Sequence, residues 1–187
     1  MNIIKQIAAA ILLAATVFTA KAQTIVAVES QKNALVLQVT PQKQLNALYF
    51  GGKLANQSEY EAIAKQYKYI SHTGEANQAY STSGSTNILE PALAVTHADG
   101  NRSLALKYVD HKTTNISDNI TLVSINLRDS VYNFEVTLNY QTYIKENVTE
   151  QWTVIKHHEK KEVVLNKYAS ANLYLQNNGY WLNHSPW

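Results

Sequence analysis

Hydrophobic and polar residues alternate strictly from Tyr132 to Gln141, within the segment 131–144. One side of this segment carries aromatic and aliphatic side chains, and the other carries Asn, Glu, Thr and Gln. A period of two is typical of a β-strand with one buried and one solvated face. We therefore expect a long strand here, within an antiparallel sheet.

Other segments rich in Val, Ile, Thr and Tyr predict further strands along the chain. They are residues 25–28, 34–39, 45–50, 92–96, 104–109, 120–127, 148–155 and 163–175. The turn at Asp99-Gly100 predicts a hairpin between 92–96 and 104–109, followed by a polar connection over 110–119. The pattern favours an all-β fold built mainly from antiparallel strands.

One short helix interrupts the strand pattern. Ser58 is followed three residues later by Glu61, which matches a capping box at a helix start. Apolar residues then recur at helical spacing, at Tyr60, Ile63, Ala64 and Tyr67. We expect no other helix after residue 22.

Two polar segments predict connections. Residues 71–87 are rich in Ser, Thr, Gly and Asn and predict a long loop. Residues 156–162 are charged and predict a solvent-exposed hairpin tip joining the last two strands. Adjacent His157 and His158 lack a third ligand at metal-site spacing, so we expect no metal there. The same solvated interpretation applies to His72, His97, His111 and His184.

The first 22 residues predict a signal peptide. Lys5 precedes an almost continuous apolar run over residues 7–18, and Ala20 and Ala22 occupy the positions that a signal peptidase reads. A membrane anchor is the alternative, but the run is shorter than the roughly 20 residues that a bilayer requires. We expect export to the periplasm or secretion, a mature start at Gln23 and no membrane partner.

Composition narrows the function classes further. Residues 23–187 are enough for one domain with its own core. The chain contains no Cys, so it forms no disulfide. Loss of Lys5 and Lys21 with the signal takes the formal net charge from +2 to zero, which argues against a nucleic-acid partner. We expect no cofactor.

An ordered series of short segments points to a known family. The series is E-P-A-L-A-V from Glu90, D-G from Asp99, L-R-D from Leu127, V-T-L-N-Y from Val136, Q-W-T-V-I from Gln151, V-V-L-N-K-Y-A-S-A from Val163 and Y-W-L from Tyr180. This order resembles the N-terminal domain of glycoside hydrolase family 36, whose best known members are α-galactosidases. The resemblance covers most of the mature chain and is strongest after Glu90.

The resemblance implies an antiparallel β-supersandwich, similar to the galactose mutarotase-like sandwich, that precedes a catalytic (β/α)₈ barrel. A barrel takes about 250 residues, so we expect residues 1–22 to be the signal peptide, residues 23–187 to be the N-terminal domain, and the barrel to be absent. Both catalytic acids belong to the barrel in this family. We therefore assign no catalytic residue here and expect the chain alone to be inactive. The available acids fit helix caps, loops or turns instead, namely Glu61, Glu75, Glu90 and Asp99.

The resemblance also implies roles for the domain within a longer enzyme. It would bind α-galactosides only through the missing catalytic domain, pack on that domain, shape its sugar pocket and support homo-oligomer contacts. Trp187 lies near a family Trp at the rim of the sugar site and is our one candidate sugar contact. Asn87 and Leu89 stand where the family presents an acidic and a basic residue, so that contact does not carry over.

Three alternatives remain open at this stage. A carbohydrate-binding or assembly module would share the fold without any enzymatic role. A small outer-membrane β-barrel also suits an exported, Tyr-rich, Cys-free chain, although Pro186 and the predicted helix count against it. A free-standing mutarotase-like enzyme would need a general acid and base, for which His97 and His111 are available.

Overall fold

The computed structural model describes residues 24–66, 77–85 and 90–173. The predicted signal peptide, Asn87, Leu89 and Trp187 lie outside these ranges. Strands β1 (Thr24–Glu29), β2 (Asn33–Val39) and β3 (Leu45–Gly52) form one sheet in the order β1-β2-β3. Strands β5 (Leu106–Ser117), β6 (Ile120–Asp129), β7 (Phe134–Tyr143) and β8 (Val148–His157) form a second sheet in the order β5-β6-β7-β8. Strands β4 (Leu93–Thr96) and β9 (Val164–Tyr168) form a third.

All pairings within these three sheets are antiparallel, which confirms the predicted strand type. The alternation seen in the sequence sets the faces: Ile125 lies opposite Leu138, and Leu127 lies opposite Val136. All four side chains are buried. Because side chains alternate across a strand, this register gathers the apolar residues of β6 and β7 on one face.

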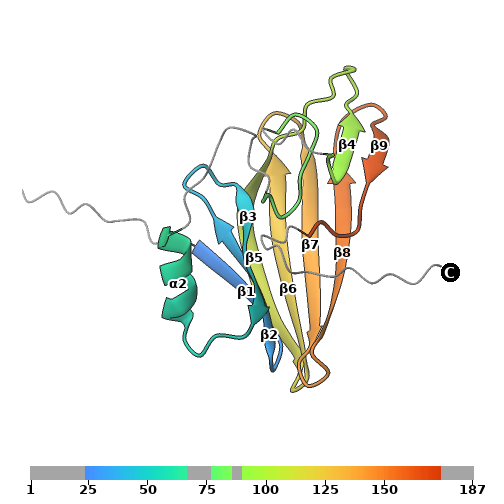
Figure 1. Cartoon of the computed structure of the whole chain (residues 1–187). Helices are drawn as coiled ribbons and strands as arrows, with labels where there is room; N and C mark the ends of the chain where they lie inside the picture. The colour runs from blue at the N-terminus through green and yellow to red at the C-terminus, as the bar shows by residue number, and fades with distance from the viewer. Residues whose placement is uncertain (1–23, 67–76, 86–89, 174–187) are drawn as a thin grey trace, which may run out of the picture.

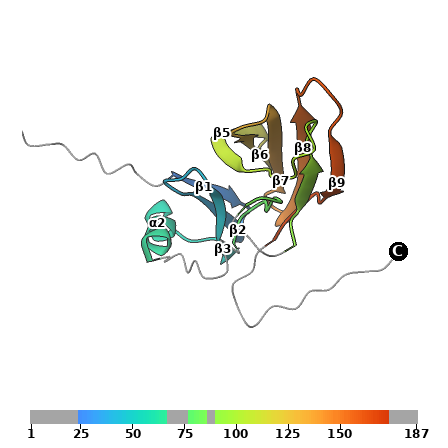
Figure 2. The ribbon, with the colours of Figure 1, turned by 90° about the horizontal axis from the view of Figure 1, so that it is seen from above.

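The main core lies between the first and second sheets (Figures 1 and 2). Val26, Val28 and Leu37 from the first sheet join the same cluster as Phe134, Leu138 and Tyr140 from β7. Two sheets that face each other with interdigitated side chains are the arrangement expected of a sandwich-like, all-β domain.

Helix α2 (Gln57–Gln66) covers the opposite face of the first sheet (Figure 1). Tyr60 is 1% exposed and packs in a second cluster with Ala34 and Val36 of β2. Its hydroxyl donates to Glu29 at 2.9 Å and accepts from the Leu54 backbone N–H at 3.0 Å. The part of the chain that the structure describes holds no helix with the length and apolar character of a membrane span.

The predicted helix start was two residues late. The backbone N–H of Asn56 donates to Glu59 at 2.9 Å, which is the return bond of a capping box. The helix therefore begins at Gln57, and Ser58 and Glu61 lie within it. Asn56 is as good a cap as Ser, and two overlapping motifs of the same spacing offered no local basis for choosing between them.

The predicted hairpin between 92–96 and 104–109 was wrong. Strand β4 pairs with β9, and β5 pairs with β6 instead. The segment 110–119, predicted as a connection, mostly continues β5 to Ser117. Strand β5 is an edge strand, and most of its exposed residues are polar. Backbone pairing with β6 does not require apolar side chains there.

The predicted hairpin of the last two strands was wrong as well. Within the described sheets, β8 pairs with β7, whereas β9 pairs with β4. Residues 158–163 therefore connect two different sheets rather than the arms of one hairpin. Strand β9 is also shorter than the predicted 163–175.

Stability should fall in alkaline solution because of Tyr140. Burial raises the pKa of this phenol far above its usual value of 10.0. Above about pH 10 the unfolded chain releases this proton while the folded chain keeps it, so the free energy of unfolding should drop by about 1.4 kcal/mol per pH unit for this group. Tyr140→Phe should remove that contribution in urea titrations between pH 9 and 12. Tyr168→Phe, in an exposed ring, is the control, and an unchanged slope in Tyr140→Phe would contradict the assignment.

Candidate functional site

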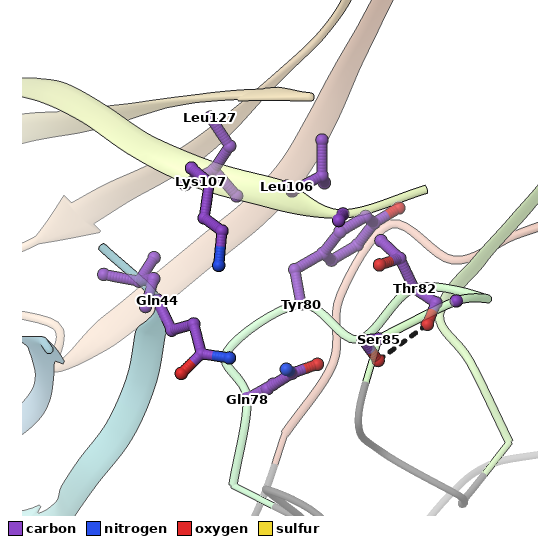
Figure 3. A pocket seen from close by; sticks show the side chains of 11 residues that line it. Gln44, Gln78, Tyr80, Thr82, Ser85, Leu106, Lys107 and Leu127 are labelled. Atoms are coloured by element: carbon purple, nitrogen blue, oxygen red, sulfur yellow. Dashed lines mark hydrogen bonds between the residues drawn. The ribbon is translucent and has the colours of Figure 1, made fainter. Parts of the chain in front are cut away.

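A pocket of about 130 Å³ opens where the start of β5 meets the segment 78–85 and the residues that lead into β3 (Figure 3). Its apolar side is formed by Leu45, Tyr80, Leu106 and Leu127. Its polar side carries Gln44, Gln78, Thr82, Ser85 and Lys107. Residues distant in the sequence thus meet at one edge of the core.

Three polar side chains approach one another in this pocket. Figure 3 shows Lys107 extending from β5 toward the carboxamides of Gln44 and Gln78. Gln78 is only 7% exposed, yet its side-chain amide makes no hydrogen bond to the part of the chain that the structure describes. Lys107 is half-buried and has no ion pair within the described ranges. The pocket therefore presents donors that the fold leaves available.

The rim of the pocket is held by a tight loop. The Thr82 hydroxyl donates to the Leu104 carbonyl at 2.6 Å, and the Leu104 N–H donates to the Ser83 carbonyl at 2.8 Å. Gly84 follows Ser83 in this loop and has φ +90°. A Cβ at Gly84 would lie 2.7 Å from the Cα of Ser103. Only glycine allows both this φ and this approach.

Gly84→Ala should therefore destabilise the protein by about 2 kcal/mol. Both the left-handed backbone and the clash with Ser103 oppose a methyl group. Gly100→Ala is a matched control because Gly100 has φ +89° and a methyl group there would meet nothing within 4 Å, so it should cost about 1 kcal/mol from the backbone alone. Chemical denaturation of both variants measures the difference, and equal losses would show that the close approach is unimportant.

A second polar cluster surrounds His97. This side chain is 2% exposed, and its ring stacks on Tyr132 with centroids 3.6 Å apart. Nδ1 lies 2.8 Å from Glu159 Oε1, and Nε2 lies 3.1 Å from the Ser103 carbonyl oxygen. The other oxygen of Glu159 accepts from the Ala98 N–H at 3.0 Å. The cluster ties the connection after β8 to the turn after β4.

The solvated interpretation of His97 was therefore wrong. The sequence did contain a signal, because His97 directly follows β4 and continues the alternation of Leu93 and Val95, which are both fully buried. Because side chains alternate between the two faces of an extended segment, His97 is expected on the same buried face as Leu93 and Val95. No local feature of residues 156–162 indicated that Glu159 would turn toward it, since that contact spans 62 residues.

The acids considered earlier have structural partners. Asp99 accepts from the Asn101 N–H at 2.9 Å and from the Tyr132 hydroxyl at 2.8 Å, and these bonds, led by Asn101, lower its pKa. Glu90 pairs with Lys167, whose hydrogen bond lowers the pKa of Glu90. Glu61 is exposed on α2, and Glu75 lies outside the described residues.

The structure does not join His97 and His111 in one site. His111 Nδ1 lies 2.6 Å from the Tyr108 hydroxyl on β5, whereas His97 faces Glu159. Within the described ranges no group of three His, Cys, Asp or Glu side chains has the geometry to hold a metal ion.

A larger pocket of about 380 Å³ lies beside β2, β7 and β8. Its lining is mostly apolar and includes Leu35, Phe50 and Tyr140. Its Asn147 is already engaged, since Oδ1 accepts from the Ser30 hydroxyl and from the Lys32 N–H. The smaller pocket at Gln78 is therefore the better candidate for a polar ligand.

Solved structures share this fold. An α-galactosidase from Lactobacillus brevis matches with a TM-score of 0.69 at 18% identity, over 81% of this chain and 24% of that one. The galactosidase domain of an α-galactosidase-sucrose kinase matches with a TM-score of 0.70 at 19% identity, over 79% and 24%. A variant α-galactosidase from Geobacillus stearothermophilus in complex with raffinose matches with a TM-score of 0.65 at 20% identity, over 79% and 24%. The chain thus spans about a quarter of the length of these structures.

The comparisons also decide between the interpretations left open by the sequence. No curated protein matches the chain in sequence. The family model of the glycosyl hydrolase family 36 N-terminal domain, however, matches residues 43–186. That match includes every segment of the resemblance from Glu90 onward and favours the glycoside hydrolase interpretation over the alternatives. The chain belongs to the glycosyl hydrolase family 36 N-terminal domain family.

Proposed function

We propose that this chain is the non-catalytic, N-terminal β-supersandwich domain of an exported α-galactosidase-like glycoside hydrolase. The family match over residues 43–186 is the observation that carries the proposal. The coverage of 24% of the matched galactosidases supports it, because most of each of those proteins lies beyond the shared fold. Two of the matched structures hold raffinose or stachyose, so the substrate class of the complete enzyme is terminal α-galactosides.

The surface for packing on the catalytic barrel is formed by β8 and β9. These strands expose apolar side chains that a domain alone would leave in water, namely Val148, Val154, Val164, Leu165 and Tyr168. Tyr168 is 65% exposed and Val164 is 56% exposed. Exposed large apolar residues that gather on two strands of a domain mark an interaction surface. Packed there, the domain forms one wall of the sugar pocket and supports contacts between enzyme copies.

A hydrolysis assay tests the non-catalytic role. The purified protein should release no chromophore from a p-nitrophenyl α-galactoside above the uncatalysed rate. A retaining glycosidase needs two carboxyl groups about 5 Å apart across the sugar, whereas the described acids Asp99, Glu90 and Glu159 are engaged by Tyr132, Lys167 and His97. Turnover that survives removal of contaminating activity would overturn the proposal. N-terminal sequencing of exported protein, with a start at Gln23, would support the exported location.

In the purified 187-residue chain the β8 and β9 surface should cause self-association. Leu165→Lys should shift sedimentation at rising concentration toward monomer, because a charge cannot be buried in an apolar contact. Val131→Lys is the matched control, since Val131 is 80% exposed but lies between β6 and β7. A wild-type protein that stays monomeric at all concentrations, or an equal effect of both variants, would contradict the assigned surface.

A further inference from the structure

We propose that the pocket at Gln44, Gln78 and Lys107 binds a carboxylate group, either of an acidic sugar or of a small free carboxylic acid. The ligand's oxygens would accept hydrogen bonds from the Lys107 ammonium and from the two carboxamides. Its carbon atoms would rest on the apolar side of the pocket.

Charge selects the ligand class. Lys107 is the one charged residue among the described residues that line the pocket, and no Asp or Glu lines it. The ammonium is half-buried and has no ion pair in the described part of the chain. A partly desolvated cation without a counter-charge favours an anion and disfavours a cation.

Gln78 provides an independent indication of a ligand. Its side chain is more than nine-tenths buried and lines the pocket, while its main-chain carbonyl is held by the Asn172 carboxamide at 3.0 Å. The side-chain amide has no partner among the residues described here. Its amide atoms are not themselves enclosed, so they are open to the pocket. A ligand oxygen near the Gln78 amide would accept a hydrogen bond from it, and Figure 3 shows Gln44 and Lys107 on the same side of the pocket.

The size of the pocket limits the ligand. The volume of about 130 Å³ is small for a ligand pocket, so only a small group fits inside it. That space accepts a carboxylate with two or three attached carbons, or the acidic end of a sugar ring that continues into solvent. Leu45, Leu106 and Leu127 provide the apolar contact for those carbons.

Calorimetric titration of the purified full chain tests the assignment with three probes. Galacturonate and galactose differ only at C6, where one carries a carboxylate, and propionate offers the carboxylate without a sugar. We expect galacturonate, propionate or both to bind, and galactose to bind at least about tenfold more weakly than the better of them. Lys107→Met should weaken that binding by about tenfold or more at low salt, and Gln78→Leu should weaken it as well.

Lys112→Met is the matched control because Lys112 lies on the same strand, is exposed and does not line the pocket. Thermal melting of each variant verifies that it folds, and shifts of the Gln side-chain amide signals in ¹⁵N–¹H spectra locate the ligand without relying on Lys107→Met.

Binding of galacturonate alone identifies an acidic sugar as the source, and equal binding of propionate identifies a free acid. Galactose binding as tight as galacturonate, no binding of either acid, or unchanged affinity in Lys107→Met would each overturn the assignment. Carboxylate binding here requires nothing of a longer enzyme, so its failure would leave the proposed function intact.

Discussion

Glu159→Ala should lower the free energy of unfolding by about 3 kcal/mol, one of the two largest effects that we expect from a single residue outside the apolar core. The Glu159 side chain is 9% exposed and that of His97 is fully buried. Removing the carboxylate would leave the Nδ1 of His97 and the Ala98 N–H without their acceptor. Unsatisfied buried donors of this kind carry the full cost of desolvation.

The hydrogen-bond pattern of His97 explains why the loss should be large. Nε2 faces the Ser103 carbonyl, which only accepts, so Nε2 carries a hydrogen. A neutral ring would then offer Nδ1 as an acceptor to a carboxylate oxygen, which is also an acceptor. The contact between Nδ1 and the carboxylate therefore contains a hydrogen, and His97 and Glu159 form one buried, hydrogen-bonded pair. Breaking that pair from either side leaves a desolvated polar group behind.

Urea denaturation of a double-mutant cycle measures this coupling. His97→Ala, Glu159→Ala and the double variant should give an interaction energy of about 1.5 kcal/mol or more. Glu162→Ala is the control from the same connection, since Glu162 is exposed, and it should change stability by less than about 0.5 kcal/mol. Equal small effects at Glu159 and Glu162 would show that the contact with His97 does not stabilise the fold.

Asp129→Ala should destabilise the protein by about 3 kcal/mol for a different reason. Asp129 is 5% exposed, and its carboxylate accepts three backbone hydrogen bonds, from the N–H groups of Ala105, Val131 and Tyr132, at 2.6 to 2.7 Å. These bonds join the chain just before β5 to the turn between β6 and β7. Alanine would leave three N–H groups without an acceptor, and each costs about 1 kcal/mol or more.

The Asp129→Asn variant distinguishes the hydrogen bonds that the side chain accepts from the effect of its negative charge. Asp129→Asn keeps one acceptor oxygen and should lose about half as much stability as Asp129→Ala. Asp118→Ala, at an exposed turn between β5 and β6, is the control with little expected change. The denaturation midpoints of the three variants rank them by stability. An Asp129→Ala protein as stable as Asp118→Ala would refute the role of the Asp129 carboxylate. Because Ala105 lines the candidate pocket, Asp129 also positions one wall of it.

Local pattern was enough to predict most of the strands. Alternation over residues 131–144 placed Leu138 and Tyr140 inside, and both are buried in β7. Such inferences succeed because side-chain direction along a strand depends only on position parity. The ordered segments after Glu90 were also sufficient for the family, which the family model confirms. Export and the role of Trp187 are still predictions.

Pairing partners and the candidate pocket depended on contacts between residues far apart in the sequence. No local signal showed that β4 would pair with β9 rather than with β5, because edge strands present similar backbone groups to any partner. Gln44, Gln78 and Lys107 come from three separate segments and become neighbours only when the sheets pack. The sequence of each strand therefore determined which of its two faces is buried. Which strands pair with each other was decided only when the sheets packed and buried those apolar faces together.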